Sequence, residues 1–135
     1  MALVTWTDNL SVGVKSIDDQ HTVLFNTIND LHAAMMKGQA RAKVGELLCT
    51  LLVYTRSHFS DEEAIMEKSK YPGLATHRVE HRKLTNQVEG FVRRYQEGDL
   101  SVSVELADFL SNWLKNHIQG VDQSYRPWLN KCGVF

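Results

Sequence analysis

The sequence contains little proline: its two prolines, Pro72 and Pro127, lie far apart in a chain of 135 residues. Alternation of apolar and polar residues, which is typical of half-buried strands, continues for no more than a few positions anywhere. Long stretches instead repeat apolar residues every three or four positions. The scarcity of proline and this helical period together predict an all-α protein.

Three other absences concern the environment of the protein. No stretch reaches the roughly 18 consecutive apolar residues that a membrane-spanning helix requires. The N-terminus, MALVTWTDNL, lacks a basic segment followed by an apolar one, so we expect no secretory signal. The formal net charge is −1, which provides no basic surface for nucleic acid or an anionic membrane. We therefore expect a cytoplasmic protein that neither inserts into membranes nor binds nucleic acid.

Only two cysteines occur, Cys49 in an apolar helical stretch and Cys132 near the C-terminus. Their unrelated contexts favour two separate thiols over a disulfide, which fits a reducing compartment. With 43% hydrophobic and 23% charged residues, the chain has an ordinary globular composition. Its length suits one domain with a buried core, and we predict a single domain over residues 1–135.

Four segments with the helical period are separated by short turn signals. After an irregular N-terminal arm through Ile17, we expect helices at about 18–37, 40–68 and 74–97, and from 101 or 103 to at least 118. Ser16 with Asp19 gives a weak capping signal for the helix at 18–37. A short helical piece follows Gly120. Helices of this length with short connections predict an antiparallel up-down-up-down four-helix bundle.

The inner faces of these helices carry ionisable residues where apolar ones are normal. Residues four apart lie one turn apart on the same face of a helix, so two such side chains can converge on one metal ion. Any single histidine would be explained more simply as a hydrogen-bonded core residue. Five histidines and two acids on the inner faces of all four helices indicate a metal site instead: His21, His58, Glu62, His77, His81, His117 and Asp122.

Spacing separates the acids that face inward from those that do not. Glu62 lies four residues beyond His58 and shares its face, whereas Glu63 lies five beyond, about 140° further round, and should face away. Asp122 also lies five residues beyond its histidine, His117. We expect Gly120 to break the helix between them and so redirect Asp122 inward.

The number of donors indicates which kind of site this is. Five imidazoles and two carboxylates exceed what one tetrahedral zinc can use. Two six-coordinate ions fit better if Glu62 and Asp122 both bridge them together with one solvent-derived oxygen. Three histidines then complete one ion, and the other two leave the second ion with one vacant position. A vacancy with no other reactive group nearby suits end-on binding of a small molecule.

The pattern H…HxxxE…HxxxH…HxxxxD, with the segments HFSDEEAIM and WLKNHI, resembles the hemerythrins from Trp6 to the C-terminal tail. The resemblance implies two non-haem iron ions with an oxo or hydroxo bridge. It implies that the six-coordinate iron is held by His77, His81 and His117. It implies that the five-coordinate iron is held by His21 and His58, and that the two irons are bridged by Glu62 and Asp122. It also implies that dioxygen binds the open iron, taking one electron from each metal and the proton of the bridge.

Apolar residues next to the predicted ligands form the bundle core. We expect the same side chains to wall the vacant iron position and to exclude water and protons. They are Leu24, Phe59, Trp113, Leu114 and Ile118.

Other polar residues have weaker assignments. His32 lies about 16 Å along the helix from His21, too far to join the cluster, and is expected at the core or rim. Hydrogen bonding near the site and ordinary packing are equally plausible for Tyr125. Gln20 and Asp18 could orient ligand imidazoles.

These features predict an oxygen-binding protein, not an enzyme, that carries, stores or scavenges dioxygen. We expect a monomer that can hand dioxygen to an oxygen-consuming enzyme. An oxygen or redox sensor would need an output domain, and a di-iron oxidase is typically richer in carboxylates. HRVEH formally matches the HxxEH motif of zinc peptidases, which are ordinarily far larger. A purely structural bundle would leave the seven inner polar groups unexplained.

Overall fold

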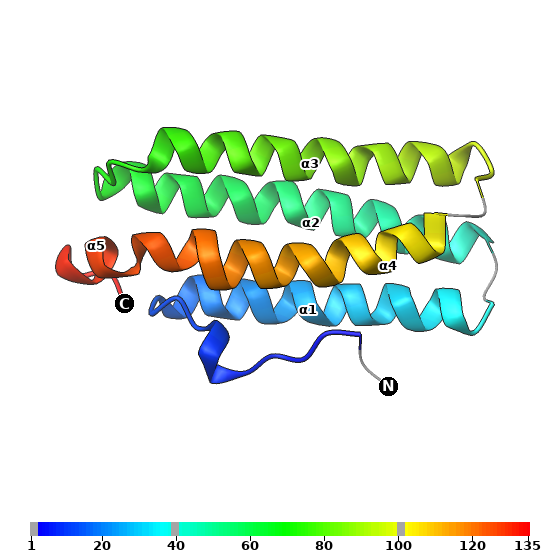
Figure 1. The fold of residues 1–135 in the computed structure, drawn as a ribbon, viewed down its shortest axis with the longest axis horizontal. Helices are drawn as coiled ribbons and strands as arrows, with labels where there is room; N and C mark the ends of the chain where they lie inside the picture. Colours follow the sequence, from blue (N-terminus) through cyan, green and yellow to red (C-terminus); the bar gives the residue numbers. More distant parts are fainter. Residues whose placement is uncertain (1–2, 39–40, 100–101) are drawn as a thin grey trace.

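The computed structural model describes residues 3–38, 41–99 and 102–135, except for the side chains of Ser103, Leu114 and Lys115. Its long elements are α1 (Lys15–Met36), α2 (Arg41–Lys68), α3 (Leu74–Gln96) and α4 (Val102–Trp113). A π-helical segment, η2 (Leu114–Val121), continues α4. Figure 1 shows these helices side by side, each reversing the direction of the one before. The predicted up-down-up-down four-helix bundle is confirmed.

The first helix begins earlier than predicted. It starts at Lys15 instead of Asp18, and its N-cap, Val14, makes no side-chain capping bond, so the capping role given to Ser16 is wrong. Asp18 has a different task. Its carboxylate accepts hydrogen bonds from Ser11 Oγ (2.6 Å) and from Val12 N (2.9 Å), and this fastens the N-terminal arm to α1.

The other predicted helix ends agree with the structure to within a residue or two where they can be compared. The second helix ends at Lys68 and the third begins at Leu74, as expected. The predicted first residue of the second helix, Ala40, and the possible cap Ser101 lie outside the described residues. The arm contains a 3-10 turn, η1 (Asp8–Leu10), and the chain ends with η3 (Asp122–Tyr125) and α5 (Arg126–Lys131).

The apolar interior is divided into two clusters. The larger fills most of the bundle and includes Leu24, Phe59 and Ile118. The smaller lies where η3 and α5 cover the end of the bundle: Val12, Val14, Ile17, Met66, Tyr125 and Leu129. On α1 the residue between Ile17 and Leu24 on the inner face is His21, so a polar layer separates the two apolar clusters.

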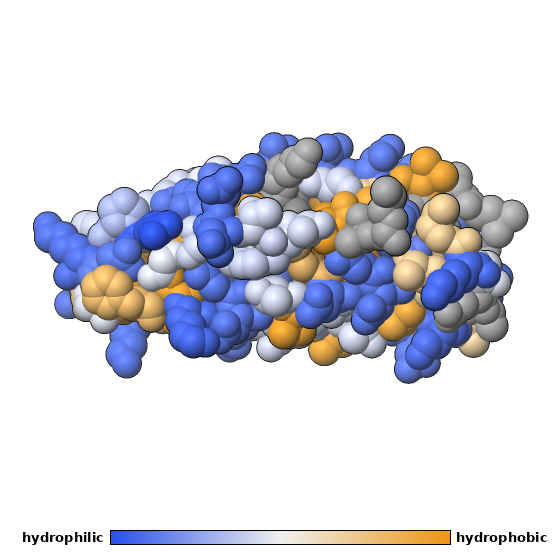
Figure 2. Space-filling model, turned by 90° about the horizontal axis from the view of Figure 1, so that it is seen from below, coloured by the Kyte–Doolittle hydropathy of each residue, from blue (hydrophilic) through white to orange (hydrophobic). Residues whose placement is uncertain are grey.

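The surface is mixed. In the view of Figure 2, hydrophobic residues are scattered among hydrophilic ones. The two cysteines are free and exposed. Among the described residues, no helix is both long and apolar enough to cross a lipid bilayer.

Candidate metal centre

The polar layer between the apolar clusters consists of the seven side chains that the sequence predicts. α1 provides His21, α2 provides His58 and Glu62, and α3 provides His77 and His81. The chain after α4 provides His117 and Asp122. Each is at most 4% exposed. Their donor atoms form two groups that share Glu62, and within each group all donor atoms lie within 4.8 Å of one another. His32 is half-buried and belongs to neither group.

Glu62 lies between two sets of histidines and turns one oxygen to each. Its Oε2 is 3.3 Å from His58 Nε2 and 3.7 Å from His21 Nε2. Its Oε1 is 3.0 Å from the Nε2 atoms of both His77 and His81. The carboxylate therefore spans the distance between the two sets.

Asp122 repeats this arrangement from the other side of the cluster. Its Oδ2 is 3.3 Å from His21 Nε2. Its Oδ1 is 2.8 Å from His77 Nε2 and 3.0 Å from His117 Nε2. Both acids thus contact both sets of histidines. One set consists of His21 and His58, and the other consists of His77, His81 and His117.

Most of these inward-facing atoms make no hydrogen bond. The atoms without a partner include Asp122 Oδ2 and the Nε2 atoms of four histidines, His21, His58, His81 and His117. Burying unpaired polar atoms costs free energy. Two ligands at right angles on one metal, each about 2.1 Å from it, would lie about 3 Å apart, which is close to the separations found here. The donor set therefore fits a pair of metal ions.

The winding of the chain after α4 explains why Asp122 faces inward. In an α-helix a residue five positions beyond His117 would point to a different side. In the π-helical segment η2, hydrogen bonds join residues five apart, and Asp122 N donates to His117 O. Residues five apart are then about one turn apart, so both side chains face the cluster.

The break predicted at Gly120 is therefore wrong in its mechanism, although α-helical hydrogen bonding does fail in this region. Gly120 lies inside the continuous η2 segment, and its φ is not positive. A Cβ atom added there would meet nothing within 4 Å. The change in helical winding, and not a glycine-dependent turn, brings Asp122 to the site.

Comparison with known proteins agrees with this site. The chain matches the family model described as "Hemerythrin HHE cation binding domain" over residues 12–129. The chain belongs to the hemerythrin family. It is 42% identical over 125 residues to a bacteriohemerythrin of Stenotrophomonas maltophilia, covering 93% of this chain and 80% of that protein. With a bacteriohemerythrin of Methylococcus capsulatus it shares 36% identity over 131 residues, covering 96% and 99%.

The fold agrees as well. A crystal structure of a wild-type hemerythrin matches with a TM-score of 0.88 and 36% sequence identity, covering 95% of this chain and 98% of the other. The resemblance inferred from the spacing of the histidines and acids is confirmed at the level of the family.

Without metal, two of the histidines favour the protonated form. Burial opposes the charged form of His21 and His77, but the carboxylates of Asp122 and Glu62 outweigh it and raise the pKa of each histidine to about 9. Burial also opposes the charged form of Glu62, but the surrounding histidines hold its pKa well below the ordinary value. Metal binding must displace the protons from these imidazoles, because a ligating nitrogen needs a free lone pair.

Side chains behind the cluster orient some of these imidazoles. Gln20 Oε1 lies 2.7 Å from His58 Nδ1, which is the orienting contact that the sequence suggested for Gln20. Glu63 points away from the cluster as predicted, but its Oε2 lies 2.8 Å from His81 Nδ1, a contact that sequence reasoning missed. Its other oxygen accepts a hydrogen bond from Arg78 Nε at 3.1 Å. Such contacts fix the orientation of a ligating imidazole and raise its basicity.

Tyr125 also contacts the cluster. Its hydroxyl donates to Glu62 Oε2 at 3.2 Å, and its ring is fully buried. Burial and the two nearby carboxylates raise the pKa of this hydroxyl well above its ordinary value, so it remains a donor. Of the two roles weighed from the sequence, hydrogen bonding at the site and packing, Tyr125 has both.

Four of the five residues predicted to wall the site are buried in the large apolar cluster: Leu24, Phe59, Trp113 and Ile118. The Phe59 ring stacks on His81 with centroids 3.8 Å apart, and Trp113 meets Phe59 edge-on. The side chain of Leu114 lies outside the described part of the structure.

The corrected account of η2 changes the expected effect of altering Gly120. Gly120→Ala should preserve metal binding and raise the free energy of unfolding by about 0.5–1 kcal/mol, because alanine loses less backbone entropy in a helix than glycine. Gly13→Ala is the contrasting variant, since Gly13 has φ +74° and an added Cβ would lie 2.6 Å from Arg126 Nε. Denaturant unfolding and metal analysis would test this, and loss of metal in Gly120→Ala would restore the turn hypothesis.

Neighbouring acids on α2 should differ sharply in their effect on metal binding. Glu62→Ala should abolish binding of a metal pair, because it removes the carboxylate that contacts both histidine sets. Glu63→Ala should still bind two ions, with affinity lowered about tenfold, because only the contact to His81 is lost. Glu67→Ala, which removes an exposed partner of Arg78, is the control. Metal content after chelator competition would measure this, and equal losses in Glu62→Ala and Glu63→Ala would contradict it.

Proposed function

We propose that this hemerythrin-family protein binds dioxygen reversibly at a non-haem di-iron centre. The observation that carries the proposal is the position of its two buried acids. Glu62 and Asp122 each turn one oxygen to a set of two histidines and the other oxygen to a set of three. This is the arrangement needed for two carboxylates that bridge two metal ions, one held by two histidines and the other by three.

These contacts support the following ligand assignment. One iron would be held by His77, His81 and His117, and the other by His21 and His58. Both irons would share the carboxylates of Glu62 and Asp122. A solvent-derived oxo or hydroxo group would be the third bridge. The iron held by only two histidines would receive one protein ligand fewer than the other, so it would be the one that can bind dioxygen.

A donor set rich in neutral imidazoles favours reversible binding over oxidation of a substrate. When reduced, the two irons would supply one electron each to dioxygen. Highly oxidised iron is stabilised by anionic oxygen ligands, of which this chain provides two, so we expect no catalytic turnover.

The chain's own residues would keep the bound state intact. Leu24, Phe59 and Ile118 belong to the apolar cluster on one side of the polar layer and would limit the entry of water. Tyr125 would hold Glu62 in position through its hydrogen bond to Oε2. We expect residues 1–135 to act as one domain, as a monomer that carries, stores or scavenges dioxygen and hands it to an oxygen-consuming enzyme.

The metal and its spectrum provide the most direct test. Protein isolated in air should contain two irons per chain, one for each donor group, and should absorb in the near ultraviolet through oxygen-to-iron charge transfer. Reduction should bleach this absorption, and dioxygen should then produce a visible band that disappears under vacuum. A colourless protein with a single zinc would contradict the proposal and favour the zinc-peptidase alternative.

The apolar wall should control how long dioxygen stays bound. Leu24→Ala would open space beside polar, metal-binding groups that water can occupy, so oxidation of the oxygenated protein should become several-fold faster. Leu31→Ala is the matched control, because Leu31 is equally buried on α1 but lies two turns further from His21. Oxidation rates of both variants, measured with iron content unchanged, would decide this. Equal rates in Leu24→Ala and wild type would limit Leu24 to packing.

A further inference from the structure

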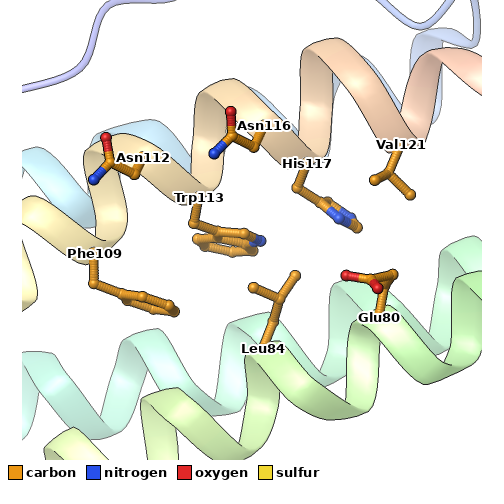
Figure 3. Close-up of a pocket in the computed structure, with 8 residues that line it drawn as sticks. All are labelled: Glu80, Leu84, Phe109, Asn112, Trp113, Asn116, His117 and Val121. Atoms are coloured by element: carbon orange, nitrogen blue, oxygen red, sulfur yellow. The ribbon is translucent and has the colours of Figure 1, made fainter.

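A pocket of about 290 Å³ lies between α3 and the chain formed by α4 and η2 (Figure 3). Its walls are apolar, with polar groups at the rim and at the end nearest the metal cluster. The lining residues are Glu80, Leu84, Phe109, Asn112, Trp113, Asn116, His117 and Val121. The pocket therefore reaches the outer side of one histidine of the cluster, His117.

The outer nitrogen of His117 lacks an acceptor. His117 is 4% exposed, and its Nδ1 makes no hydrogen bond. The corresponding nitrogens of His58 and His81 do have acceptors, from Gln20 at 2.7 Å and Glu63 at 2.8 Å. A metal bound at Nε2 would leave the proton of His117 on Nδ1, as a buried donor without a partner.

An acceptor is available across the same pocket. Glu80 projects from α3 toward η2, and in Figure 3 its carboxylate lies opposite the His117 ring. Its side chain is 40% exposed, and Lys83 Nζ lies 3.9 Å from its Oε1. The carboxylate can therefore turn toward His117 without breaking a short ion pair or losing all contact with water.

We propose that Glu80 is a positioning residue for the metal centre: in the metal-loaded protein its carboxylate accepts the Nδ1–H of His117 and fixes the orientation of that imidazole. This inference rests on the proposed di-iron function. It gives the three-histidine iron two carboxylate-backed imidazoles, His81 through Glu63 and His117 through Glu80. A carboxylate acceptor raises the basicity of a ligating imidazole, which stabilises the oxidised state of its iron.

Three variants separate this role from a surface role. Glu80→Leu removes the acceptor, Glu80→Gln keeps an oxygen that can accept but removes the charge, and Lys83→Ala removes only the neighbouring lysine. In chelator competition, Glu80→Leu should hold iron about tenfold less tightly than wild type, Glu80→Gln should fall between them, and Lys83→Ala should match wild type. The iron midpoint potential should rise most in Glu80→Leu, less in Glu80→Gln and not in Lys83→Ala.

Two further measurements test whether the variants remain folded and whether the proposed contact forms. Unfolding of the metal-free protein should be the same in all three variants and wild type. A crystal structure of the iron-loaded protein should show a Glu80 oxygen within about 3.2 Å of His117 Nδ1.

Several outcomes would overturn the inference. Nδ1 donating to Asn116 or to water would do so, and so would an iron affinity and potential of Glu80→Leu equal to those of Lys83→Ala. Either result, with two irons bound in wild type, would leave the proposed function standing. A wild-type protein that binds no iron would overturn the proposed function itself and this inference with it.

Discussion

Two carboxylates and five imidazoles are buried together in the bundle, and the rest of the structure is arranged around the need to satisfy them. An isolated buried carboxylate would be strongly destabilising. Here each acid is surrounded by histidine nitrogens at 2.8–3.7 Å, and protons or metal ions can neutralise its charge. The bundle can therefore bury this polar layer only when each carboxylate has its histidines and a neutralising proton or metal ion. The site and the fold thus depend on each other.

The apolar parts of the protein enclose this layer from both ends. The large cluster lies on one side, and the small cluster formed with η3 and α5 lies on the other. The small cluster contains Ile17 and Met66, each one turn from a site residue, and also Tyr125, which contacts Glu62 directly. The arm, fastened by Asp18, and the C-terminal residues are thus part of the site's enclosure.

The contacts behind the imidazoles differ around the cluster, and this asymmetry bears on the chemistry of the two irons. His58 is backed by a neutral amide, from Gln20, and His81 by a carboxylate, from Glu63. A charged acceptor makes a ligating imidazole a stronger donor than a neutral one does. Under the proposed function, the carboxylate contact to His81 would favour the oxidised state of the iron held by the three-histidine set.

The sequence by itself determined the helical bundle and the seven polar residues of its core. It could do so because helical spacing is a local property: His58 with Glu62, and His77 with His81, lie one turn apart wherever an α-helix forms. The separation of Glu62 from Glu63 follows from the same geometry, as does the exclusion of His32 from the cluster.

Only the tertiary structure decided the remaining features. The helical period assumed for all segments does not hold after α4, where π-helical bonding instead of a break at Gly120 brings Asp122 beside His117. The contact of Glu63 with His81 joins two different helices, so no spacing along one helix could reveal it. The hydrogen bond of Tyr125 to Glu62 likewise joins residues 63 positions apart, so it forms only when the C-terminal residues pack against α2. Local periodicity places residues on a face, whereas contacts between elements depend on how those faces pack.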